Sequence, residues 1–184
     1  GTIIGTGDKS DDSTSVADNG QIDQYVLTFS EPVDDSTLST SSFNVDGYTL
    51  DTIQTGSDGD DKTIVLDLTE SGTSDTAATP DVTISSPTLE DANSNTILTV
   101  EAGDVSESDS ATAAALSASY TDATGSDQTV DQITVTFSES VSAEGTVDAA
   151  DFTLDGGELS GDDSSVSGTS VVTDLSTSTS TVTI

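Results

Sequence analysis

Apolar and polar residues alternate along several short stretches of the chain, and the clearest of these stretches occurs twice, at 23–31 and at 131–139. A period of two places successive side chains on opposite faces of a β-strand. Each copy therefore predicts a strand with one buried and one wet face. The apolar parity comprises Tyr25, Leu27 and Phe29 in the first copy, and Ile133, Val135 and Phe137 in the second.

Other apolar runs follow the same pattern and are separated by turn residues. The segments 48–53 and 63–68 flank an Asp- and Gly-rich loop and predict a hairpin. Further strands are predicted at 43–45, 82–84 and 96–100, with an edge strand at 2–5 followed by a loop at 8–13, and a loop or short helical turn at 34–42. Short strands punctuated by turns are typical of an all-β sandwich.

The two copies can be aligned beyond the strand that identifies them. Ile22 aligns with Val130, Phe29 with Phe137, Val33 with Val141 and, after one inserted residue, Phe43 with Phe152, while 181–184 resembles 63–66. A Gly-, Ser- and Asp-rich region lies between the copies, and 118–120 is expected to begin the second. The sequence therefore predicts two domains, 1–110 and 111–184.

The second copy lacks counterparts of the strands at 82–84 and 96–100. Two explanations remain open. The chain is a fragment of a longer array, or a neighbouring subunit supplies a strand across the open edge. The second explanation makes the edge near Ile184 a candidate for self-association with identical or neighbouring subunits.

Three motifs carry a resemblance to a known family: T-F-S-E-P-V at 28–33, S-F-N-V-D-G at 42–47 and the loop at 89–95. Together they resemble the bacterial and archaeal Ig-like repeats of large cell-surface proteins, in particular the SwmB type. Ser94 replaces the usual Gly before Asn95, Ser140 replaces the Pro in the second copy, and the third motif occurs only in the first.

The resemblance implies tandem Ig-like Greek-key β-sandwiches, the second incomplete, in a structural protein of the extracellular space or cell surface. A surface layer, stalk, pilus-like filament or adhesin would use such modules without catalysis. A glycan or another cell-surface molecule is a further possible partner of such a protein.

The net charge of −33 changes the picture in two ways. Combined with only 31% hydrophobic residues it is typical of disorder, but the alternating runs indicate a folded chain. A highly acidic surface repels itself in dilute buffer, and molar salt screens that repulsion. The composition therefore predicts a halophilic protein whose fold depends on salt. The same charge argues against nucleic acid and anionic membranes as partners, because there is no basic patch.

Residue types that commonly act in catalysis are scarce. The chain contains no Cys and no His, so thiol sites, disulfides and Ser-His-Asp catalysis are excluded, and we expect no enzyme. The sequence has no apolar run of about 18 residues that would predict a membrane span.

Calcium is the candidate ligand, because it takes hard oxygen ligands and Asp-rich loops supply them. Asp58, Asp60 and Asp61 form the best local group. The alternative is a solvated, salt-adapted loop with no specific ion, since close Asp pairs arise by chance in so acidic a chain. We expect no cofactor to be required.

Overall fold

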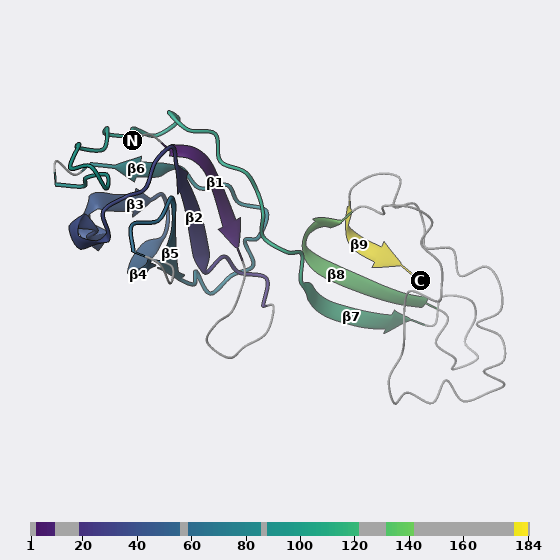
Figure 1. Cartoon of the computed structure of the whole chain (residues 1–184). Coiled ribbons are helices and arrows are strands. Elements are labelled where there is room, and N and C mark those ends of the chain that lie inside the picture. The colour runs from purple at the N-terminus through teal and green to yellow at the C-terminus, as the bar shows by residue number, and fades with distance from the viewer. Residues whose placement is uncertain are drawn as a thin grey trace. The chain divides into compact units, whose positions relative to one another are not determined.

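The computed structural model describes residues 3–9, 19–55, 59–85, 88–121, 132–141 and 179–183. Its regular elements are antiparallel strands and two short 3-10 turns, η1 (Asp35–Thr37) and η2 (Thr40–Ser42), so the predicted all-β class is confirmed (Figure 1). The backbone contacts divide the chain into two compact units, Gly1–Thr112 and Ala113–Ile184.

The larger layer of the first unit is an antiparallel sheet of four strands in the order β1-β2-β5-β4. These strands are β1 (Ile3–Lys9), β2 (Gln24–Phe29), β4 (Thr49–Gln54) and β5 (Thr63–Thr69). The predicted hairpin of β4 and β5 is confirmed. The loop predicted at 8–13 is wrong at its start, because Asp8 and Lys9 still pair with β2. Polar side chains do not prevent backbone pairing at a sheet edge.

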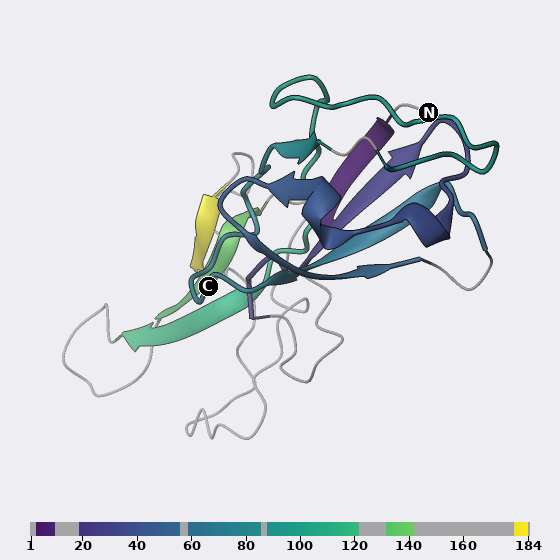
Figure 2. The ribbon, with the colours of Figure 1, turned by 90° about the vertical axis from the view of Figure 1, so that its left-hand side faces the viewer.

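The smaller layer consists of β3 (Phe43–Val45) and β6 (Val82–Ile84), with η1 and η2 before β3 (Figure 2). Ile84 also exchanges two backbone hydrogen bonds of 3.0 Å with Val100. The predicted strand at 96–100 is wrong, because only isolated bridges form there. Ile97 and Val100 are both buried, and two residues three positions apart cannot share one face of a regular strand.

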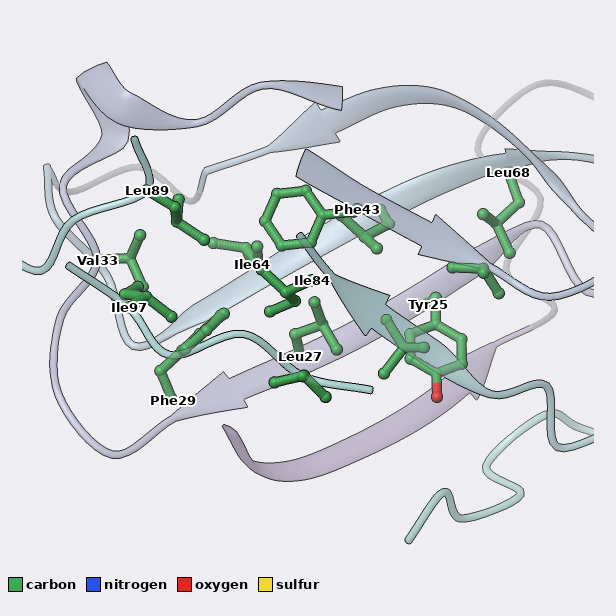
Figure 3. Close-up of a cluster of buried hydrophobic side chains, with 14 of the residues drawn as sticks. Tyr25, Leu27, Phe29, Val33, Phe43, Ile64, Leu68, Ile84, Leu89 and Ile97 are labelled. Atoms are coloured by element: carbon green, nitrogen blue, oxygen red, sulfur yellow. The ribbon is translucent and has the colours of Figure 1, made fainter. Parts of the chain in front are cut away.

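The hydrophobic core lies between these two layers (Figure 3). Tyr25, Leu27 and Phe29 point into it from β2 and are at most 1% exposed, which confirms the predicted parity. Phe43 and Ile84 point toward them from the smaller layer. Burial of side chains of this size stabilises the fold by about 1.5–3 kcal/mol each.

The strand β4 reaches the core through a bulge. Leu50 pairs with Leu68 and Ile53 with Leu66, and the register shifts in between, so Asp51 is the extra residue. Without this shift, Leu50 and Ile53 would face opposite sides of the sheet. The bulge lets both side chains pack against the core.

The described strands of the second unit are β7 (Ala115–Thr121), β8 (Gln132–Val141) and β9 (Thr179–Thr183), in the order β7-β8-β9. The strand expected around 118–120 is therefore confirmed. Phe29 pairs with Ile3 of β1, and the aligned Phe137 pairs with Ala115 of β7. In both units the edge strand has a bulge directly after the residue that pairs with the phenylalanine.

The third strand of each ladder repeats the register as well. Leu27 pairs with Ile64, and its counterpart Val135 pairs with Val182. These pairings agree with the alignment of 181–184 on 63–66. The backbone of β7-β8-β9 thus repeats that of β1-β2-β5.

The aligned central strands differ in where they end. β2 ends at Phe29, whereas β8 continues to Val141. Pro32 has no N–H to give to a ladder, and Ser140 at the aligned position does. A one-residue difference in the motif thus accompanies the difference in strand length.

Candidate functional site

The acidic loop predicted as a calcium site lies partly outside the described residues, because Asp58 is not among them. Asp60 has a left-handed backbone with φ 58°, and its Oδ1 accepts a hydrogen bond from the Asp35 N–H at 3.2 Å. The carbonyl of Asp61 accepts a hydrogen bond from the Val33 N–H at 2.9 Å. The described part of the loop is therefore tied to the segment that follows β2.

The carboxylates of that segment have different surroundings. Asp34 Oδ1 accepts hydrogen bonds from the Ser36 N–H at 2.9 Å and the Ser36 hydroxyl at 2.7 Å, so it caps η1. Asp35 Oδ1 is shielded from solvent and has no hydrogen-bond partner among the described residues.

These groups do not assemble into a metal site in the described part of the chain. Within it, no three acidic side chains are placed to hold a metal ion. Calcium takes six to eight oxygen ligands, and the described structure does not supply such a set from Asp60, Asp61 and their neighbours. The assignment of calcium to Asp58, Asp60 and Asp61 stays a prediction.

The loop at 89–97 also lies against the segment that follows β2, and it contains a buried carboxylate. Asp91 is only 1% exposed. Its Oδ1 accepts the N–H groups of Asn93 at 2.8 Å and Asn95 at 2.9 Å, and the Asn95 side-chain amide lies 3.0 Å from Oδ2. A buried charge is tolerated when it is satisfied in this way.

Backbone hydrogen bonds fasten this loop to the segment after β2. Asp34 N–H donates to the Glu90 carbonyl at 2.9 Å, and Ala92 N–H donates to the Pro32 carbonyl at 3.0 Å. Val33 forms an isolated antiparallel bridge with Asp91. The first and third family-like motifs of the sequence are therefore neighbours in space.

The hydrogen bonds to Asp91 also set its acidity. Those from the Asn95 backbone N–H and side-chain amide are the main cause that holds the pKa of Asp91 below its ordinary value, and the Asn93 N–H adds to it. Burial acts in the opposite direction and is outweighed. Asp91 is a structural anion in this loop.

Two further carboxylates, Asp75 and Asp67, link segments that are distant in the sequence, and neither was predicted as a site residue. Asp75 accepts the Ile22 N–H at 2.8 Å and the Tyr48 hydroxyl at 2.9 Å. Asp67 on β5 accepts the side-chain amides of Gln24 at 3.2 Å and Gln54 at 2.7 Å. The period-two pattern places Asp67 on the wet face, but nothing in the neighbouring sequence predicts that Gln24 and Gln54 are its hydrogen-bond partners.

Sheet edges are the other candidate surfaces, because the sequence predicts self-association at the edge near Ile184. Both edge strands of the first sheet are irregular, since β1 shifts register between Ile3 and Gly5 and β4 between Leu50 and Thr52. Bulges at edges hinder pairing with a foreign strand. In the second unit β9 pairs with β8, and Ile184 lies outside the described residues.

Comparisons with protein-family models, with curated proteins and with solved structures found no match. Among the described residues, no helix is long and apolar enough to cross a membrane.

Proposed function

We propose that this chain is a structural module of an extracellular cell-surface or filament protein, made of tandem Ig-like Greek-key sandwiches that work in high salt. Its role is to provide spacing and contacts with identical or neighbouring subunits. The proposal does not involve catalysis.

The observation that carries the proposal is the repeated ladder. The pairs Phe29–Ile3 and Leu27–Ile64 recur as Phe137–Ala115 and Val135–Val182. The edge strands β1 and β7 are both bulged directly after the residue that pairs with the phenylalanine. Two copies of one sheet framework in a single chain are expected of a protein that builds length from repeated modules.

The polar groups support a structural role as well. The buried carboxylate of Asp91 accepts hydrogen bonds from its own loop, and the half-buried Asp75 accepts them from Ile22 and Tyr48, directly ahead of the β2 and β4 regions. Asp67 links side chains of β2 and β4 across the wet face of the sheet. These acids are engaged within the fold and do not converge on one pocket.

The irregular edge strands and the net charge of the chain support assembly through specific contacts only. The bulges of β1 and β4 discourage indiscriminate strand addition, and the net charge of −33 opposes aggregation. Contacts between subunits would then require screening of charge by salt and a specific matching surface.

Immunogold electron microscopy of intact producing cells tests the proposal. Antibodies raised against the purified chain are expected to label surface arrays or filaments on unpermeabilised cells. An antibody against a cytoplasmic protein serves as the control for cell integrity. Label that appears only after permeabilisation would overturn the proposal.

A calcium-binding module is a second candidate, and one observation favours it. Asp35 Oδ1 is shielded from solvent and lacks a hydrogen-bond partner among the described residues, and its own N–H contacts Asp60. A cation bound by the acidic loop would satisfy that oxygen.

A further inference from the structure

The dipeptide Asn19-Gly20 is chemically distinct from the rest of the chain. It is the only Asn-Gly pair in the sequence, since the other asparagines precede Val45, Ser94 and Thr96. Glycine has no side chain to hinder its backbone nitrogen. In a flexible chain this nitrogen therefore reaches the preceding asparagine side chain more readily than that of any other residue type.

The reaction available to such a pair is deamidation. The Gly20 nitrogen bonds to Cγ of Asn19, and the side-chain amide nitrogen leaves as ammonia, taking the proton lost from the Gly20 N–H. Water then opens the resulting five-membered imide at either carbonyl. The products are aspartate and isoaspartate, and in the latter the main chain runs through the side-chain carbon.

The folded first unit holds both groups away from this reaction. Asn19 Oδ1 accepts the Gln21 N–H at 2.9 Å, and Asn19 Nδ2 donates to Glu70 Oε1 at 2.9 Å. Gly20 is buried with φ 79°, and its carbonyl accepts the Asp75 N–H at 2.9 Å. Rotation of the Asn19 side chain toward the Gly20 nitrogen would break its hydrogen bonds to Gln21 and Glu70.

Modification at this position would damage the start of the core. Ile22 lies three residues further along, is fully buried, and donates its N–H to Asp75 Oδ1 at 2.8 Å. Isoaspartate at position 19 lengthens the main chain by one carbon, three residues before Ile22. Either product also replaces the donor that faces Glu70 with a second carboxylate.

From this geometry we propose that Asn19 is a deamidation site that folding protects, so that a chain that stays unfolded is converted there and loses the ability to refold. The inference concerns the fate of the unfolded chain and does not depend on the proposed function.

Peptide mapping by mass spectrometry tests the protection. The full chain is incubated in one mildly alkaline, high-salt buffer, with and without urea at an unfolding concentration. Conversion of Asn19 is expected to be at least about tenfold faster in urea, because the folded chain reacts only through local opening. Asn93 and Asn95 in the same samples are the internal controls. Equal rates in the two samples, or no conversion at Asn19 in urea, would overturn the proposal.

Refolding by dilution tests the consequence. The native circular dichroism signal regained by the wild type is expected to fall with time in urea, in step with isoaspartate at Asn19. Asn19→Gln, which cannot form the five-membered imide, is expected to keep its initial yield. Asn19→Asp carries the charge without the longer main chain, and it should refold better than the isoaspartate product. Full refolding of a wild-type sample in which Asn19 has been converted would refute the second half of the proposal.

Discussion

Replacement of Phe29 with Ala is the most direct test of the core. The ring is 0% exposed and points from β2 toward the smaller layer (Figure 3). Its removal takes away buried apolar surface and leaves a cavity, a combination that costs about 3–5 kcal/mol. Domains of ordinary size are stable by only about 5–15 kcal/mol, so this single change should remove a large part of the free energy of unfolding of the first unit.

Urea unfolding in molar salt, followed by tyrosine fluorescence, can measure this loss. The chain has no Trp, so tyrosines dominate the signal. Tyr25 is buried and Tyr48 is partly buried in the first unit, whereas Tyr120 of the second unit is 60% exposed. The signal change therefore reports mainly on the first unit. With a slope of about 2 kcal/mol per M urea, the midpoint should fall by about 2 M.

Two matched variants decide whether burial is the cause. Val26→Ala changes the half-buried opposite face of the same strand and should cost about 1 kcal/mol or less. Phe137→Ala changes the aligned ring, which is half-buried in β8 of the second unit, and should leave the tyrosine-detected midpoint of the first unit unchanged. If Phe29→Ala were as stable as Val26→Ala, the assignment of the core between the two layers would be refuted.

Four further predictions follow from loops and charge. Ser94→Gly should raise the free energy of unfolding by about 0.5–1 kcal/mol, because Ser94 has φ 64°; thermal melting checks this, with Ser94→Ala as a control that should not stabilise. Because the pKa of Asp91 is lowered in the folded state, its contribution to stability is present above the unfolded value of about 3.9 and is lost as the pH falls through the folded value. Urea titrations of wild type and Asp91→Asn should therefore converge on acidification, and a constant difference would contradict this. Far-ultraviolet circular dichroism should show loss of strand signal when salt is lowered from 1 M to 0.1 M, where the Debye length grows from about 3 Å to about 10 Å; a full signal at low salt would rule out a salt-dependent fold. Calcium added in molar sodium chloride should leave the melting temperature unchanged, and a rise abolished by Asp60→Asn would instead favour the calcium-binding alternative.

The sequence allowed the ladder of the fold to be predicted well because side-chain parity is a local property. Tyr25, Leu27 and Phe29 alternate with polar residues, and burial of one face follows directly from that alternation. The resemblance of 181–184 to 63–66 agrees with the register of β9, because Val182 pairs with Val135 as Ile64 pairs with Leu27.

The remaining features depend on partners that are distant in the sequence. Leu50 and Ile53 differ in parity, and only the register against Leu68 and Leu66 shows that a bulge at Asp51 brings both to the core. The stretch at 96–100 has the composition of a strand, but Ile97 N–H is taken by Leu89 and Val100 pairs with Ile84. Tertiary hydrogen bonds here outweigh a weak strand preference.

The roles of the acidic residues in the candidate site are equally hard to predict from the sequence. Asp60, Asp75 and Asp91 are chemically identical in the sequence, but they differ in the structure. Asp60 lies in a loop with a left-handed backbone, Asp75 links two segments outside the strands, and Asp91 is a buried anion. What separates them is the number of N–H and O–H donors that surround each carboxylate, and most of these donors come from distant segments or from turn geometry. In a chain this acidic, the density of Asp is therefore a poor guide to a binding site. Burial together with converging donors is the better criterion, and by that criterion Asp91 is the best-satisfied of the three.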